Sequence, residues 1–205
     1  MNWQEQATRI REELEAEHQA REGALSRCRK VIQSSSRAIR HIHRGEFENA
    51  TALIHEAENT AKAIRQDLQS APRILYAGYV HDAEKEWVEA AVLLAMIQGT
   101  PWPSASELGV EAVTYLHGVA EAASELRRTM LDRMRADEFQ VAAQYLKVME
   151  DVYDELISMD YPDGLTAGLR RATDALRAVL ERTRSDFTLT ELQERLRKDM
   201  TARLD

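Results

Sequence analysis

Apolar residues recur every three or four positions along most of the chain, which is the spacing of one face of an α-helix. Near the N-terminus this stripe begins at Trp3 and reaches Ile42, and polar Glu17 and Arg21 interrupt it without changing the helical phase. The pattern predicts one very long first helix that ends at Gly45. A stripe of this length indicates packing against several helices or against another subunit.

Six further helices are predicted after the first. They run from Phe47 to Gln69, from Pro72 to Gln98, from Ser106 or Gly109 to Arg135, from Asp137 to Ser158, from the turn cluster 160–164 to Arg184, and from Thr190 onward. Asp137 with Gln140, and Thr190 with Gln193, have the spacing of helix-opening capping boxes. The chain has only 8 glycines and 4 prolines, too few breakers for a protein made of sheets. The expected fold is all-α, a seven-helix bundle with a very long first helix.

Composition predicts an ordinary cytoplasmic domain. The 205 residues are 44% hydrophobic, which is enough for a core, and no linker divides the predicted single domain 1–205. The longest strongly apolar run, Ala90 to Ile97, is too short to cross a bilayer, and the acidic N-terminal stretch does not resemble a signal segment. The single cysteine, Cys28, fits a core position on the first helix.

The net charge of −8 does not indicate nucleic-acid binding by itself. However, 22 of the 27 basic residues are arginine, whose planar side chain suits phosphate contacts. On the first helix Arg37, Arg40, His41 and Arg44 lie close together on the surface. They form either a solvated face or a ridge that contacts phosphates.

Acidic residues on the predicted third helix are the strongest candidates for chemistry. Asp82, Glu86 and Glu89 share one helical face, and the apolar run that follows them predicts a buried helix. Carboxylates that are partly removed from water repel one another unless a cation joins them. Mg²⁺ and Mn²⁺ take such oxygen ligands, so a metal site is one interpretation and a solvated acidic face is the other.

The predicted fourth helix repeats this polar pattern. His117, Glu121, Glu125 and Arg128 form one line among small residues that permit close helix approach. If the third and fourth helices pack side by side, Glu86, Glu89 and Glu121 converge on one metal. Such an ion would activate water and stabilise charge during phosphodiester cleavage. A di-iron bundle is excluded because it needs two Glu-x-x-His motifs and the chain has one, at 15–18.

The order of these motifs resembles the translin/Trax family along nearly the whole chain. The pair formed by Glu86-Trp87-Val88-Glu89-Ala90 and the stretch from Tyr115 to Arg128 carries most of the resemblance. Further matches are Ser36-Arg37 through His43-Arg44, the turn Asp160-Tyr161-Pro162-Asp163-Gly164, and Gly168-Leu169-Arg170-Arg171 with Asp174.

The resemblance implies a translin-like helical bundle that assembles as an octameric shell around single-stranded RNA or DNA. It implies catalytic roles for Glu86, Glu89, Glu121 and Glu125, with Mg²⁺ or Mn²⁺ held by the first three. Glu121 stands where the family usually has Asp, so its carboxylate is displaced by one methylene. Translin-like subunits lack the paired glutamates, so the chain looks Trax-like and would form the shell as a homo-oligomer.

Three functions follow as hypotheses. The first is an Mg²⁺-dependent endoribonuclease for single-stranded RNA, with Arg127, Arg128 and the arginines of the first helix positioning phosphates. The second is a non-catalytic oligomer that binds single-stranded RNA or DNA, which predicts salt-sensitive binding without turnover. The third is a helical scaffold for protein partners.

Overall fold

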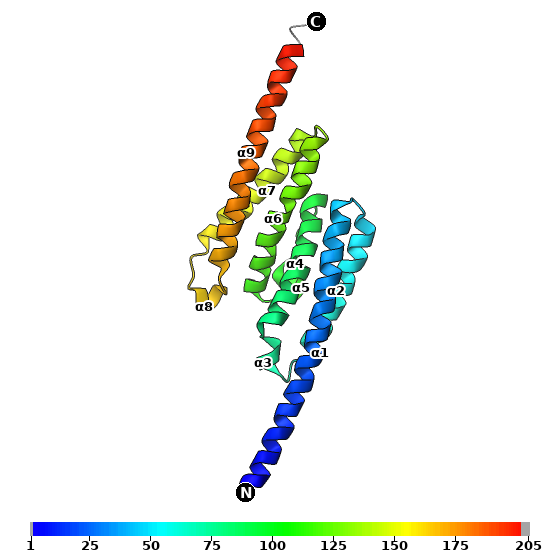
Figure 1. Ribbon diagram of the computed structural model, residues 1–205, viewed down its shortest axis with the longest axis vertical. Helices are drawn as coiled ribbons and strands as arrows, with labels where there is room; N and C mark the ends of the chain where they lie inside the picture. Colours follow the sequence, from blue (N-terminus) through cyan, green and yellow to red (C-terminus); the bar gives the residue numbers. More distant parts are fainter. Residues whose placement is uncertain (1, 202–205) are drawn as a thin grey trace.

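The computed structural model describes residues 2–201, and within this range the chain forms helices and no strand (Figure 1). The helices are α1 (Trp3–His43), α2 (Phe47–Asp67), α3 (Pro72–Leu75), α4 (Gly78–Gln98), α5 (Ala105–Leu108), α6 (Ala112–Arg135), α7 (Phe139–Ser158), α8 (Asp163–Thr166) and α9 (Leu169–Thr201). The all-α class and the very long first helix are confirmed. The described residues form nine helices, however, and not the seven predicted.

The different count has two physical reasons. The short helices α3, α5 and α8 have 4 residues each and lie in connections that were predicted as loops or as parts of longer helices. In addition, the predicted sixth and seventh helices are one continuous helix, α9. The hydroxyl of Thr190 donates to the carbonyl oxygen of Asp186 at 2.8 Å, which is a bond of a helix interior, so the predicted helix start at Thr190 is wrong.

The predicted capping box at Asp137 is also wrong. Asp137 has a φ of 61°, in the left-handed region, and α7 begins only at Phe139 with no side-chain cap. By contrast, Gly99 ends α4 as expected from its sequence position. Its φ of 65° is one that glycine adopts without steric cost, and its N–H bonds to the carbonyl oxygen of Ala95.

The long helices lie side by side along the long axis of the molecule (Figure 1). Helix α1 packs against α2 and α4, α4 packs against α6, and α6 packs against α7 and α9. Helix α4 is therefore central. Its second half is apolar on all sides and buried, as the sequence predicts, with Trp87, Leu93 and Met96 in the core.

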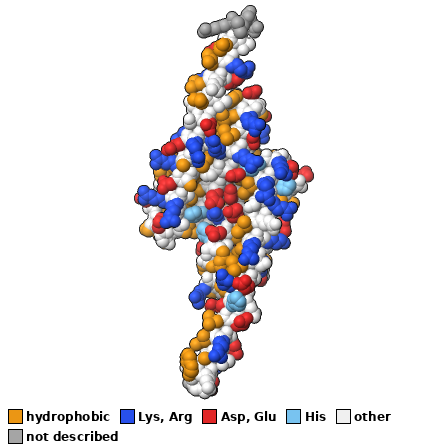
Figure 2. All heavy atoms as spheres, in the orientation of Figure 1, with side chains coloured by type: hydrophobic (Ala, Val, Ile, Leu, Met, Phe, Trp, Pro, Cys, Tyr) orange, Lys and Arg blue, Asp and Glu red, His pale blue; other side chains and the backbone are white. Residues whose placement is uncertain are grey.

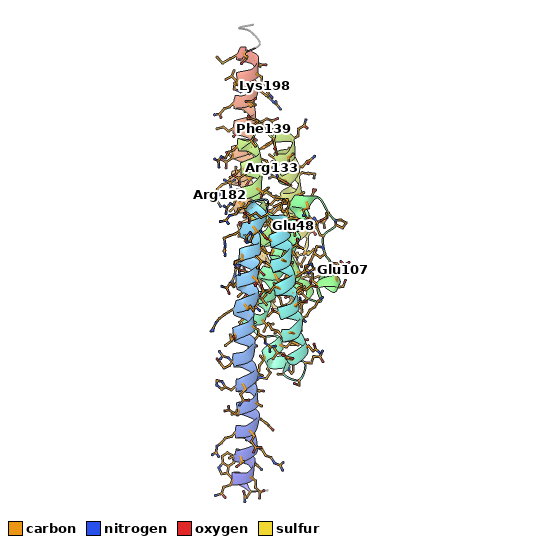
Figure 3. All side chains as sticks on the ribbon, turned by 90° about the vertical axis from the view of Figure 1, so that its right-hand side faces the viewer. Glu48, Glu107, Arg133, Phe139, Arg182 and Lys198 are labelled. Carbon is orange, nitrogen blue, oxygen red and sulfur yellow. The ribbon has the colours of Figure 1, made fainter. Side chains whose placement is uncertain are left out.

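Both α1 and α9 extend beyond this packed body, at opposite ends of the molecule (Figures 1 and 3). The apolar stripe of α1 is buried only from Ala24 onward. Before it, the exposed apolar side chains are Trp3, Ile10 and Leu14, and on the projecting part of α9 they are Leu189, Leu192, Leu196 and Met200. Among the helices described, none combines the length and the apolar character that a membrane span requires.

Candidate metal centre

The close approach of α4 and α6 creates the site. Gly118 of α6 lies against Val88 of α4, and a Cβ atom built on Gly118 would be 2.6 Å from Val88 Cγ1 and 3.0 Å from the carbonyl oxygen of Lys85. No larger residue fits there without movement. Because the helices touch at this point, polar side chains of both are brought together along their contact. These residues, here called the α4–α6 seam, are His81, Lys85, Glu86 and Glu89 of α4 and His117, Glu121 and Glu125 of α6.

Three carboxylates of the seam converge as the sequence suggested. Glu86, Glu89 and Glu121, here called the glutamate cluster, each offer an oxygen atom, and these atoms all lie within 4.8 Å of one another. Glu89 is 9% exposed, whereas Glu86 and Glu121 are half-buried. Figure 2 shows acidic side chains gathered in the middle of one face, with basic and histidine side chains around them. The cluster thus opens to solvent on one side and ends in the core on the other.

Burial and mutual repulsion disfavour the charged forms of the acids in the glutamate cluster. Burial, together with the charges of Glu121, Glu86 and Glu125, raises the pKa of Glu89 to about 8, and Lys85 opposes this shift only weakly. The pKa of Glu86 is also raised, mainly by burial, while the charge of Lys85 opposes the shift. A carboxyl group this buried and this close to others has the surroundings of a cation ligand or of a general acid.

Lys85 supplies positive charge at the glutamate cluster. Its Nζ atom donates to Oε1 of Glu121 at 2.7 Å and lies 3.9 Å from Oε1 of Glu86. Burial lowers the pKa of Lys85, but the hydrogen bond and the charge of Glu121 outweigh it, so the pKa is raised. One ammonium group therefore faces three carboxyl groups.

Glu125 lies next to the glutamate cluster but has its own partner. Nε2 of His43, on α1, lies 2.7 Å from Oε1 of Glu125, and the imidazole is almost fully buried. This bond lowers the pKa of Glu125, so the carboxylate is the acceptor and Nε2 is the donor. Nδ1 of His43 is 3.3 Å from the hydroxyl of Thr129. Helix α1 thus fixes the orientation of an acid on α6.

A hollow of about 270 Å³ opens beside these acids. It is lined by Ser36, Ile39, Arg40, His43, Glu86, Glu89, Glu125 and Arg128. Arg40 and Arg128 are exposed at its edge. Of the basic residues predicted to contact nucleic acid, these two lie beside the glutamate cluster.

The other predicted basic residues do not line this hollow. Arg127 bonds to the hydroxyl of Thr183 at 3.0 Å and to Asp186 at 2.7 Å, so it joins α6 to α9. His41 pairs with Glu46 at the end of α1. Arg37 is exposed near Glu56 of α2, and Arg44 lines a different hollow, with Thr129 and Asp132 among its neighbours. Arg37, Arg40 and Arg44 are all exposed on α1, and their contact with nucleic acid stays a prediction.

A histidine pair closes the other end of the α4–α6 seam. The rings of His81 and His117 meet edge to face with centroids 5.7 Å apart, and Nε2 of His117 donates to the carbonyl oxygen of Thr166 at 3.0 Å. Burial and the neighbouring His117 lower the pKa of His81. The hydrogen bond of His117 thus joins α6 to α8.

Two contributors to the site were not predicted from the sequence. His43 stands in a basic stretch, and nothing in that stretch shows that it turns inward toward Glu125. Lys85 lies between acids, where a lysine is ordinary on any solvated helix. His81, Lys85 and Glu89 follow one another at steps of four, so the sequence predicts that they share a polar face of α4. Which residues of α6 contact that face depends on how α6 is aligned with α4, and the sequence does not give this alignment.

Known proteins are similar to this chain over most of its length. No family model matches it. The uncharacterized protein MJ0175 of Methanocaldococcus jannaschii is 30% identical over 169 residues, which are 82% of this chain and 74% of that protein. Among solved structures, AfC3PO in a complex with duplex RNA has a TM-score of 0.85 and 31% identity, covering 92% of this chain and 97% of that one.

Two further structures support the same comparison. A crystal structure of AfC3PO has a TM-score of 0.84 and 30% identity, over 92% of this chain and 98% of that one. The structure of apo-NeC3PO, with a TM-score of 0.81 and 21% identity over 90% of this chain and 96% of that one, shares the fold.

Proposed function

This chain belongs to the translin/Trax family. From that premise we propose that it is a divalent-metal-dependent endoribonuclease. It would cleave single-stranded RNA within a homo-oligomeric helical shell. The observation that carries the proposal is the glutamate cluster. Its three carboxyl groups lie within 4.8 Å of one another, and one of them, Glu89, is buried with a pKa of about 8. An arrangement of acids that repel one another in this way is stabilised by a cation.

The donor set fits Mg²⁺ or Mn²⁺. Both ions prefer oxygen ligands and are often held by a few carboxylates together with water and phosphate oxygens. Glu86, Glu89 and Glu121 would hold the ion, and it would supply positive charge that stabilises a phosphodiester as it is cleaved. Glu125, oriented by His43, lies at the edge of the same hollow and would accept a proton or a hydrogen bond from the substrate or water there.

Arg40 and Arg128 are the basic residues placed to hold the substrate. They line the hollow that contains Glu86, Glu89 and Glu125 and are exposed to solvent. Guanidinium groups bind phosphate oxygens in a bidentate manner, so the two arginines would position the RNA backbone beside the acids. AfC3PO forms a complex with duplex RNA, which supports RNA as the ligand class.

A homo-oligomer is supported by the exposed apolar side chains on α1 and α9, and an octamer is the size that the family resemblance implies. These stripes have no partner within the described residues of the monomer, and exposed apolar surface of this kind is typical of subunit contacts. Assembly would place the faces that carry the glutamate clusters around an enclosed space.

Cleavage of a labelled single-stranded RNA in the presence of Mg²⁺ tests the enzymatic proposal. Glu86→Gln and Glu89→Gln should each lower the rate by about 100-fold or more, since even residues that only support metal ligands cost about 10- to 100-fold when they are replaced. EDTA should abolish cleavage. Glu48→Gln is the matched control, because Glu48 is an exposed acid on α2 and lies on the face turned toward the viewer in Figure 3.

Undiminished cleavage by both cluster variants would show that the activity resides elsewhere or in a contaminant. A duplex of the same sequence should be cleaved more slowly than the single strand. A preference for the duplex would contradict the proposed substrate while leaving the site intact.

A second candidate function is binding of single-stranded RNA or DNA without cleavage. The observation that favours it is that Glu121, which stands where the family usually has Asp, is held by Lys85 at 2.7 Å. This function predicts that nucleic acid is retained in a salt-sensitive manner. It also predicts no Mg²⁺-dependent turnover by the same preparation.

A further inference from the structure

Lys85 is bonded to the carboxylate of Glu121, one of the three acids that would hold the ion. Its Nζ atom is 2.7 Å from Oε1 of Glu121 and 3.9 Å from Oε1 of Glu86. Among the described residues, no other lysine or arginine comes within 4.0 Å of any carboxylate of the glutamate cluster. The ammonium group therefore acts as the counter-ion of the cluster.

An ammonium group and a divalent ion cannot share this carboxylate oxygen without strong repulsion. A hard ion binds carboxylate oxygen at about 2.0 to 2.6 Å, which would leave the two cations only a few ångström apart. At that separation like charges repel strongly, and most of all where water is partly excluded. The side chain of Lys85 is 19% exposed, so solvent does little to weaken this repulsion.

We propose that Lys85 competes with the divalent ion for Glu121, so that the lysine must leave Glu121 before the ion binds, and that Lys85 thereby sets the metal affinity of the site. This inference rests on the proposed metal centre and adds a residue to it. Lysine suits such a role because its single charge sits on a flexible stem of four carbons and can swing away. Glu121 is then shared by two cations in turn, one from the chain and one from solution.

Direct measurement of Mn²⁺ binding, without RNA, tests the inference. The variant Lys85→Met removes the ammonium group and keeps a stem of similar size, and it should lower the dissociation constant for Mn²⁺ by about tenfold or more. Lys85→Arg keeps the charge and adds a second hydrogen bond to carboxylate, so it should bind Mn²⁺ no more tightly than the unmodified protein. Titration followed by electron paramagnetic resonance of free Mn²⁺ gives the dissociation constants.

A matched control separates the contact from the general effect of net charge. Lys147→Met removes the same charge from α7, where Lys147 is exposed and pairs with Asp151. At about 0.15 M salt this change should alter the dissociation constant by less than about twofold, because charges beyond about 8 Å are screened. If Lys147→Met and Lys85→Met strengthened Mn²⁺ binding by the same factor, the inference would be overturned.

Loss of Lys85 leaves three acids without a counter-ion, and their repulsion could destabilise the fold. A second measurement therefore tests whether the variant is still folded. Without metal, the melting temperature of Lys85→Met should be lower than that of the unmodified protein. Mn²⁺ should raise the melting temperature of Lys85→Met by more than it raises that of the unmodified protein. Circular dichroism before melting checks that the helices are intact. A Mn²⁺-induced rise that is no larger than in the unmodified protein would contradict competition.

The outcomes distinguish this inference from the proposed metal centre. If Glu86→Gln abolishes Mn²⁺ binding while Lys85→Met binds like the unmodified protein, the centre stands and the competition by Lys85 is refuted. If neither the unmodified protein nor Lys85→Met binds Mn²⁺, both proposals fail. If Lys85→Met binds Mn²⁺ and the unmodified protein does not, the inference is supported in its strongest form.

Discussion

Two glutamates of α4 illustrate how neighbours decide the state of a buried acid. Glu84 is 3% exposed and Glu89 is 9% exposed, so both are buried. Glu84 receives two hydrogen bonds from the guanidinium of Arg65, one of them at 2.7 Å, and this pair joins α2 to α4. Glu89 faces the other acids of the cluster and has no cation within 4.0 Å among the described residues. Burial raises the pKa of both acids, but the bonds from Arg65 oppose the rise at Glu84, whereas at Glu89 the neighbouring acids add to it.

The stability of the metal-free protein should consequently depend on pH through Glu89. Its pKa is about 8 in the folded chain against an ordinary value of 4.5, so between these values the folded state binds more protons than the unfolded state. The free energy of unfolding should fall as the pH rises through this window, by on the order of 3 kcal/mol from this group. The groups that face Glu89 and shape this response are Glu86, Glu121, Glu125 and Lys85.

Denaturant unfolding at a series of pH values, with EDTA present, measures this dependence. Glu89→Gln keeps the shape of the side chain without the titration, so its free energy of unfolding should fall much less between about pH 5 and pH 8. Glu48→Gln should retain the slope of the unmodified protein. Parallel profiles for Glu89→Gln and the unmodified protein would contradict the shifted pKa.

At the scale of helices, one glycine determines how closely α4 and α6 approach. The backbone at Gly118 lies so near Val88 that an added Cβ would meet it at 2.6 Å, and the carbonyl oxygen of Lys85 limits any sideways movement. These two α4 residues lie in the same stretch as Glu86 and Glu89. A change in helix spacing here therefore changes the distance from Glu86 and Glu89 to Glu121.

Gly118→Ala should force the two helices apart. We expect a loss of about 1 to 3 kcal/mol in the free energy of unfolding, which is typical of overpacking in a core. The same variant should weaken Mn²⁺ binding, because Glu121 moves away from the acids of α4. Gly78→Ala is the control, since nothing lies within 4 Å of a Cβ built there. Equal stability of the two variants would show that the helix contact tolerates a methyl group.

Sequence periodicity was sufficient for the long helices but not for their boundaries. Glycine and proline breakers and apolar stripes located α1, α2 and the C-terminal ends of α4 and α6 to within a few residues. The predicted start at Pro72 lies six residues before the start of α4 at Gly78, because the short helix α3 and a turn precede α4. The capping signals at Asp137 and Thr190 failed because local spacing does not show whether the chain turns or continues there. In α9 the helix continues through Thr190, where Leu189 and Leu192 keep the apolar stripe in phase.

Two members of the glutamate cluster, Glu86 and Glu89, were predictable for a different reason from Glu121 and the residues around the cluster. Spacing within a helix places Glu86 and Glu89 on one face, and this is a local property of the chain. The contacts of Lys85 with Glu121 and of His43 with Glu125 depend on how helices far apart in sequence are aligned. His43 and Glu125 are 82 residues apart, so no local pattern links them.

At the scale of the whole molecule, the two projecting helix segments offer surfaces for assembly. On α9, Leu189, Leu192, Leu196 and Met200 follow one another at steps of three or four and form one stripe. They are exposed, and no other helix of the described residues 2–201 lies beside the last turns of α9 (Figure 1). A stripe of this kind is buried when it packs against a second helix.

The double variant Leu192→Glu/Leu196→Glu should therefore reduce the size of the proposed oligomer without unfolding the packed body. Light scattering after gel filtration should give a smaller mass, while circular dichroism should stay nearly unchanged. Lys198→Glu is the matched control, because Lys198 is exposed on the opposite side of the same segment and is labelled in Figure 3. An unchanged mass for the leucine variant would place the subunit contact elsewhere.

The α4–α6 seam holds more acidic than basic groups, and this imbalance makes metal and RNA dependent on each other. Without an ion, the seam opposes the phosphates that Arg40 and Arg128 would attract. Under the proposed function the two ligands are thermodynamically linked, so the factor by which Mn²⁺ strengthens RNA binding equals the factor by which RNA strengthens Mn²⁺ binding. RNA would then act as the effector that loads the site when the free ion is scarce.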